Sequence, residues 1–253
     1  MLKLRIIPTL LFRKFGLVKG VRFSSDRQVG PIMPAIKVYN ARDVDELAVF
    51  DVDAHLGSKE PNYGLVRDIS KECSVPLTIG GGITHIEQIE KLLEAGADKV
   101  SINSALFQNP SLIDNAVARF GSQCVVASID VTKNNGQWTC KFGSGTIDSK
   151  KNPCQWAKEL ADRGAGEILL TSIDKDGTMS GYDIELINLV ISSVSIPLIA
   201  GGGAGSARDL IDLFKHTAAS AAALASIFHF TQVTPNEVKR ELLLAGFPIR
   251  LAL

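Results

Sequence analysis

The sequence predicts a single (βα)8 barrel, a TIM barrel of the α/β class, that spans residues 1–253 as one domain. Three observations carry this prediction. The length of 253 residues suits one closed α/β barrel. Short apolar runs alternate with amphipathic helical segments along the chain. The two halves also resemble each other, because Gly80–Gly82 is matched by Gly201–Gly203 and Glu46 by Glu167, each 121 residues later. We therefore expect a twofold internal repeat of half-barrels, each with about four strand–helix units.

The first strand is expected over residues 5–11, an apolar run that Pro8 interrupts. Residues 12–30 are basic and contain glycine, and they form a stretch too long for a simple connector. We expect a loop here, either a lid over the barrel mouth or plain surface. The elements that follow are a helix over 31–41, a strand over 46–52, a helix over 62–73 and a strand over 77–79.

Residues 78–104 contain the most informative unit. A strand runs into Gly80–Gly82, a helix follows over 85–95, and a turn leads to a strand over 99–102. Free backbone N–H groups at such a loop attract an anion, and glycine lets a phosphate approach closely. Three glycines alone also fit a tight turn. Their repetition at Gly201–Gly203 favours two phosphate sites that face each other.

The remaining elements continue the alternation. Pro110 stands at an early position of the next helix, which starts at 109–111. A buried strand over 124–130 precedes a small hairpin within 131–151, with Asn134-Asn135-Gly136 at its turn. The expected order is then a helix over 153–163, a strand over 167–172, a polar loop over 174–181, strands over 198–200 and 221–225, and a helix over 235–245.

Composition excludes several classes of function. Lys plus Arg and Asp plus Glu both number 27, so the net charge is zero and no general attraction to nucleic acid or membrane is expected. No apolar run reaches the roughly 18 residues of a membrane span. The apolar N-terminus lacks a signal-peptide cleavage site, so it is expected to be a buried strand. We expect a cytoplasmic protein with no metal and no cofactor, whose cysteines are reduced and lack metal or redox spacing: Cys73, Cys124, Cys140 and Cys154.

The active site of such a barrel lies at the carboxyl ends of its strands. Asp130 ends an apolar strand, where poor solvation raises the pKa of a carboxyl group and suits it to acid–base catalysis. It could also cap the following hairpin. Asp176 beside Gly177 could orient a substrate or only shape a turn. His229 is expected to be structural, and at most one of Asp51 and Asp53 is expected to face the interior.

Four charged residues lie at or near strand starts, at the opposite rim. They could be solvated residues that flank the core, or they could close the barrel end as a ring of ion pairs. A ring would act as a plug or as a gate, and spacing alone does not choose between these. The four residues are Arg5, Glu46, Lys99 and Glu167.

The stretches RIIP, GLVKG, DELAVFDVDA, TIGGGI, GADKVSINS, GEILLTSIDKDGT, SGYD, GGGAG and ASIFHF together strongly resemble the cyclase subunit of imidazole glycerol phosphate synthase, over essentially the full length. The resemblance implies a bis-phosphorylated ribulosyl–ribosyl aminoimidazole carboxamide substrate. It also implies a glutaminase partner that docks on the N-terminal face and supplies ammonia through the barrel. The implied products are imidazole glycerol phosphate and an aminoimidazole carboxamide ribotide.

The resemblance also assigns residues. One phosphate would be held by Gly82, Asn103 and Ser104, and the other by Gly177, Gly203 and Ser226. The four rim charges match the family's salt-bridge gate, which favours the gate interpretation. Asp130 matches one of two essential aspartates. The rest of the implied substrate site consists of Lys19, Asp51, Thr171, Asp176 and Gly202.

Leu11 is the main departure, because it occupies the position of the second essential aspartate and cannot transfer a proton. Gly201 stands where serine is usual, and Asp53 where threonine is common. This pattern resembles second copies of the cyclase that are associated with surface-polysaccharide gene clusters. There a glutaminase-like partner and an amidotransferase would add an amidino group to an acetamido sugar, and the barrel would deliver ammonia. The third hypothesis is a scaffold of the glutaminase, against which the two phosphate loops argue.

Overall fold

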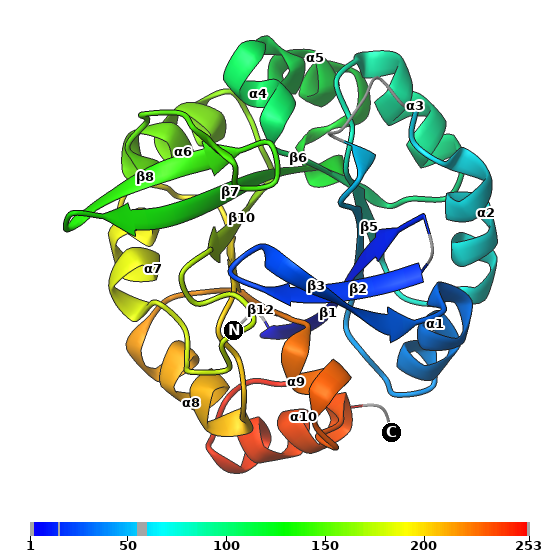
Figure 1. Ribbon diagram of the computed structural model, residues 1–253, viewed down its shortest axis with the longest axis vertical. Coiled ribbons are helices and arrows are strands. Elements are labelled where there is room, and N and C mark those ends of the chain that lie inside the picture. The colour runs from blue at the N-terminus through cyan, green and yellow to red at the C-terminus, as the bar shows by residue number, and fades with distance from the viewer. Residues whose placement is uncertain (1–2, 15, 55–59, 252–253) are drawn as a thin grey trace.

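Eight parallel strands close into a barrel in the computed structural model, which describes residues 3–14, 16–54 and 60–251 (Figure 1). Each strand pairs with the next, and the last pairs with the first from Arg5↔Ala221 to Pro8↔Leu224. The predicted (βα)8 barrel is therefore confirmed. Its strands are β1 (Arg5–Arg13), β4 (Leu47–Asp51), β5 (Leu77–Gly80), β6 (Lys99–Ile102), β7 (Val125–Asn134), β10 (Glu167–Ser172), β11 (Leu198–Gly201) and β12 (Ala221–Leu224).

Helices surround the barrel as an outer ring (Figure 1). Polar caps begin several of them: the Asn62 side chain accepts a hydrogen bond from the N–H of Leu65, and Asp183 accepts one from Leu186. The helices are α1 (Ile32–Asn40), α2 (Tyr63–Glu72), α3 (Ile86–Glu94), α4 (Ser104–Gln108), α5 (Ser111–Phe120), the 3-10 helix η2 (Ser122–Cys124), α6 (Pro153–Asp162), α7 (Ile184–Ile191), α8 (Ala207–His216), α9 (Ser226–Phe230) and α10 (Pro235–Leu244).

The expected loop at residues 12–30 was wrong. β1 continues to Arg13, and two antiparallel strands follow, β2 (Gly16–Val21) and β3 (Ser24–Gly30). Basic residues and glycines concealed the alternation of buried and exposed side chains along β2. Arg22 and Phe23 have φ angles of 54° and 60°, as a tight two-residue hairpin turn requires. The hairpin crosses the middle of the barrel in Figure 1.

The hairpin predicted within residues 131–151 is confirmed. β7 ends at Asn134, Asn135 and Gly136 have φ angles of 49° and 81°, and β8 (Gln137–Phe142) returns antiparallel to β7. Positive φ at both central residues identifies the turn that Asn-Gly favours. A short strand, β9 (Ile147–Asp148), pairs with β8 and brings the chain back to the mouth of the barrel.

The half-barrel repeat is also visible in the backbone. Asn103 caps α4 with φ −125° and ψ −83°, and Ala225 caps α9 with φ −129° and ψ −71°. Both short helices directly follow a barrel strand, and both lie where the sequence predicted a phosphate site. α4 itself was not predicted, because five residues are too few to show a helical period.

The core has two layers. A large cluster lies between the strands and the outer helices. A smaller cluster fills the barrel interior and separates the two ends of the barrel from each other. It consists of Ile7, Ala48, Val126, Leu169, Ile199 and Ala221, with Phe50 and Ala223 packed against it.

Lys239 of α10 is fully buried, with 0% of its surface exposed. Its ammonium group donates to Oδ1 of Asp45 at 2.8 Å and to the backbone oxygen of Asp43. Oδ2 of Asp45 accepts a hydrogen bond from the N–H of Ile6 at 2.8 Å. Since a buried lysine is tolerated only when paired, this contact fixes the C-terminal helix to the starts of β1 and β4.

Candidate active site

A cavity of about 620 Å³ opens at the carboxyl ends of the barrel strands. It is lined by side chains from β1, β4, β6, β7 and β10, by both glycine loops and by the β2–β3 hairpin. This is where the fold places a site. The structure brings the predicted catalytic residue and all the predicted substrate residues to this one cavity: Lys19, Asp51, Gly82, Asn103, Ser104, Asp130, Thr171, Asp176, Gly177, Gly202, Gly203 and Ser226.

Asp130 lies on β7, and its carboxylate Oδ2 accepts a hydrogen bond from the side-chain amide of Asn103 at 2.7 Å. Burial raises the pKa of Asp130 from 3.8 to about 7, and the nearby charge of Asp176 acts in the same direction. The hydrogen bond of the Asp130 side chain therefore goes to Asn103, directly after β6, and does not cap the hairpin that follows β7. A carboxyl group that titrates near neutral pH suits both proton acceptance and proton donation.

Asp176 contacts the cavity through its side chain and shapes the turn through its backbone. Its carboxylate forms an ion pair of 2.5 Å with Nζ of Lys19, a side chain that is only 3% exposed. Its N–H donates to the oxygen of Ser172, and its own oxygen accepts from Arg22. The two interpretations offered for Asp176 are therefore compatible.

The two glycine loops approach neighbouring backbone closely. A Cβ on Gly203, at φ 113°, would lie 2.1 Å from the backbone oxygen of Gly181. A Cβ on Gly82, at φ 70°, would lie 2.6 Å from the Cβ of Ala54. Beside these loops, the hydroxyl of Ser226 and Oδ1 of Asn103 are buried without a hydrogen-bond partner. Buried polar groups without partners are rare, and the Ser226 hydroxyl is suited to donate to a phosphate oxygen.

We expect Gly203→Ala to displace the second glycine loop, because the new methyl group would overlap the Gly181 oxygen. Thermal unfolding with and without a phosphorylated ligand should show a loss of the ligand-dependent stabilisation. Gly136→Ala is the matched control, since Gly136 also has positive φ but has no heavy atom within 4 Å of its added Cβ. Equal ligand stabilisation in both variants would contradict the role of this loop.

Leu11 lines the cavity from β1, as do Thr9 and Arg13 on the same face of that strand. Its register neighbours are Phe50 on β4 and Val18 on β2. Leu11 therefore contributes an apolar wall to the cavity, opposite in character to Asp130.

Only one of Asp51 and Asp53 lines the cavity, as expected. Asp51 lines the cavity and its Oδ1 accepts the N–H of Asp53 at 2.9 Å. Asp53 instead forms an ion pair with Arg13 at 3.0 Å. His229 packs against Tyr39, and burial lowers its pKa to about 4, with a further contribution from the charge of Lys19. Its neutral, half-buried ring fits the expected structural role.

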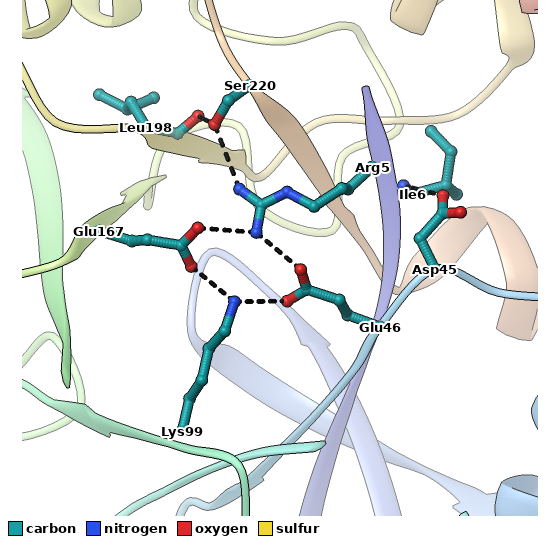
Figure 2. A network of polar contacts seen from close by, with 8 residues as sticks. All are labelled: Arg5, Ile6, Asp45, Glu46, Lys99, Glu167, Leu198 and Ser220. Atoms are coloured by element: carbon teal, nitrogen blue, oxygen red, sulfur yellow. Dashed lines mark hydrogen bonds and ion pairs between the residues drawn. The ribbon is translucent and has the colours of Figure 1, made fainter. Parts of the chain in front are cut away.

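The four rim charges form a closed ring (Figure 2). Nη1 of Arg5 lies 2.7 Å from Oε1 of Glu46 and from Oε1 of Glu167, and Nζ of Lys99 lies 3.0 Å from Oε2 of each. They are not separate solvated charges. Nη2 of Arg5 also donates to the hydroxyl of Ser220, at 3.2 Å. Ser220 was not predicted, because a single serine before a strand carries no spacing signal.

In the part of the chain that the structure describes, no cluster of three or more His, Cys, Asp or Glu side chains could hold a metal ion. Nor does that part contain a helix with the length and apolar character needed to span a bilayer.

Comparison with known proteins gives one family and several full-length relatives. The family model described as "Histidine biosynthesis protein" matches residues 5–234. A Campylobacter jejuni protein, provisionally named imidazole glycerol phosphate synthase subunit hisF2, is 45% identical over 99% of this chain and 100% of its own length. A Pseudomonas aeruginosa protein with the same provisional name is 45% identical over 91% of this chain and 92% of its own length. The imidazole glycerol phosphate synthase subunit HisF of Streptococcus sanguinis is 41% identical over 99% of this chain and 100% of its own length.

Proposed function

The chain belongs to the histidine biosynthesis protein family, and we propose that it acts as an ammonia-using cyclase subunit of the imidazole glycerol phosphate synthase type. The substrate would be the bis-phosphorylated ribulosyl aminoimidazole carboxamide ribotide of that enzyme. The products would be imidazole glycerol phosphate and aminoimidazole carboxamide ribotide. The relatives named as HisF and hisF2 support the assignment at the level of the subunit.

The observation that carries the proposal is the content of the mouth cavity. It holds two glycine loops from opposite halves of the barrel, which suits a substrate with a phosphate at each end. It also holds Asp130, whose pKa of about 7 suits it to transfer protons to and from a substrate bound between the two loops. A scaffold of a glutaminase would need neither feature.

A glutaminase subunit is the proposed partner, docked on the face that carries the ring of Arg5, Glu46, Lys99 and Glu167. The ring lies at the starts of the barrel strands and the cavity at their carboxyl ends, so ammonia released at the ring would have to pass the apolar cluster of the barrel interior to reach the substrate. In this proposal the ring is a gate. The four free cysteines agree with a cytoplasmic location.

Because leucine cannot transfer a proton, the first thing to test is whether this chain catalyses the cyclase reaction with Leu11 in the site. We expect the native chain to turn over the ribulosyl substrate with saturating ammonium, and Leu11→Asp to raise the rate by about 10-fold or more, because it adds a second proton-transfer group. Free ammonium removes any dependence on the partner. Steady-state kinetics give the measurement. Leu11→Asn is the control, because it has the size and polarity of aspartate but no transferable carboxyl proton.

A second candidate function is favoured by Leu11 itself and by the similarity to hisF2 proteins. In it the barrel delivers ammonia to an amidotransferase that amidinates an N-acetyl sugar of a surface polysaccharide. No native turnover, with activity gained in Leu11→Asp, would favour this candidate. If neither protein turns over the substrate, the cyclase proposal fails, and delivery of ammonia or a scaffold role remains.

A further inference from the structure

Two hydroxyl groups lie one layer deeper in the barrel than Asp130. Ser128 precedes Asp130 by two residues on β7, so both side chains face the barrel interior. In a barrel of this kind the inward side chains of alternate strands form layers of four, and the level shifts by about one residue from strand to strand. Followed through the pairing registers, the layer that contains Ser128 also contains Thr9 of β1, on the opposite side of the barrel. Its other two members are Gly80 and Gly201.

The two glycines of this layer leave space between the hydroxyl groups. A Cβ on Gly80 would lie 2.6 Å from Cδ1 of Phe50, so an aromatic ring closes that side. A Cβ on Gly201 would lie 3.0 Å from Oγ1 of Thr171, so a further hydroxyl group closes the other side. The bottom of the mouth cavity is therefore walled by one ring and by hydroxyl groups. We call this space the hydroxyl pocket, lined by Thr9, Phe50, Ser101, Ser128 and Thr171.

The pocket suits a small neutral molecule that forms hydrogen bonds. The Thr9 hydroxyl is buried and has no hydrogen-bond partner, a state that is rare and costs free energy unless a ligand or ordered water bonds to it. Each hydroxyl group of the pocket can donate one hydrogen bond and accept two. None of the lining side chains carries a charge, so the pocket disfavours an ammonium ion or a phosphate, because an unpaired charge is costly to bury.

The pocket lies between the apolar cluster of the barrel interior and the acid–base group. Along the inward face of β7, Val126 belongs to the apolar cluster, Ser128 follows, and Asp130 comes next. The same change from an apolar to a hydroxyl side chain occurs from Ile7 to Thr9 on β1. A neutral molecule that has passed the apolar cluster therefore reaches these hydroxyl groups one layer below Asp130.

We propose that the hydroxyl pocket binds the attacking ammonia as a neutral molecule, and that Thr9 and Ser128 are hydrogen-bond acceptors for it. The inference rests on the proposed cyclase function and locates the nucleophile of that reaction. Ammonia has three N–H donors and one lone pair. When its N–H groups donate to the hydroxyl oxygens of Thr9 and Ser128, the lone pair stays available to a substrate bound above, between the two glycine loops.

The test measures two constants for each variant: the apparent KM for ammonium at saturating ribulosyl substrate, and the KM for the ribulosyl substrate at saturating ammonium. We expect Thr9→Val and Ser128→Ala each to raise the apparent KM for ammonium by about 3–10-fold, the effect of one lost hydrogen bond. The KM for the ribulosyl substrate and kcat at saturating ammonium should stay close to native, because only binding of the nucleophile is weakened.

Matched variants separate the hydroxyl group from the shape of the side chain. Valine keeps the shape of threonine without its hydroxyl, whereas Thr9→Ser keeps the hydroxyl and should retain a nearly native KM for ammonium. Thr9→Val removes a buried polar group that has no partner, so no loss of stability is expected. Ser192→Ala, at the exposed C-cap of α7, is the control for Ser128→Ala and should leave both KM values unchanged.

Three results would overturn the inference while the native chain remains active. An unchanged KM for ammonium in both Thr9→Val and Ser128→Ala would show that these hydroxyl groups do not hold the nucleophile. A rise in the KM for the ribulosyl substrate, with that for ammonium unchanged, would show that the pocket binds the substrate itself. Equal effects of Thr9→Ser and Thr9→Val would show that shape matters and the hydroxyl does not. Absence of native turnover would instead overturn the proposed function, and this inference with it.

Discussion

Asp130→Asn should lower ammonia-dependent turnover by about 10²–10⁴-fold, since asparagine can neither accept nor return the proton that the carboxylate exchanges with the substrate. The native rate should rise with pH through about 7, because burial raises the pKa of Asp130 to that value and only the ionised form accepts a proton. Initial rates across pH 5.5–8.5 give the measurement. A native profile with no transition near pH 7 would contradict the assignment of Asp130 as the base.

Stability measurements separate this effect from a folding defect. The native state binds the Asp130 proton more tightly than the unfolded chain does, since the pKa is about 7 in the fold and 3.8 ordinarily. The free energy of unfolding should therefore fall as pH rises from about 4 to 7, by at most about 4 kcal/mol. Asp130→Asn should be more stable than the native chain at pH 8 and nearly equal at pH 4. An inactive variant that is also less stable at pH 8 would mean that the fold, and not the proton, was lost.

Lys239→Met should lower the free energy of unfolding by about 3–5 kcal/mol, because it leaves the buried carboxylate of Asp45 without its cation. Asp45 would still accept the N–H of Ile6, so the loss should not abolish folding. Urea denaturation gives the measurement. We expect ammonia-dependent turnover at low temperature to change little, since Lys239 lies at the end of the barrel remote from the cavity.

The control is the double variant Lys239→Met/Asp45→Asn. Asparagine removes the unpaired charge, and its side-chain oxygen can still accept the Ile6 N–H, so the double variant should recover part of the lost stability. Additive losses from the two substitutions would show that the ion pair is not the source of the effect.

Much of the fold could be predicted because the relevant signals are local. Strand limits over 99–102 and 167–172 agree with the structure, since an apolar run bounded by turn residues marks a buried strand. The β2–β3 hairpin could not be predicted, because Lys19 and Gly20 take buried positions along β2 where large apolar residues would mark a strand. The charged residue and the glycine indicated a loop. Lys19 can nevertheless be buried, because its ammonium group is paired with the carboxylate of Asp176, 157 residues further along the chain.

The sequence predicted which residues line the site better than it predicted which of them pair with each other. Strand ends and the half-barrel repeat placed Asp130, Gly82 and Gly203 at one mouth, because all parallel strands end at the same edge. The pairings of Lys19 with Asp176 and of Asn103 with Asp130 depend on loops whose paths spacing does not determine. The same holds for the pairing of Lys239 with Asp45, two residues that lie far apart in sequence.

The ring at the barrel floor restricts how this sequence can change over time. Its charges alternate around a closed circuit, with each cation touching both anions. Any single replacement by a neutral residue leaves an unbalanced charge, and exchanging two adjacent members places like charges side by side. Only a coordinated reversal of all four would keep the alternation. Selection acting one substitution at a time therefore meets a barrier at every first step.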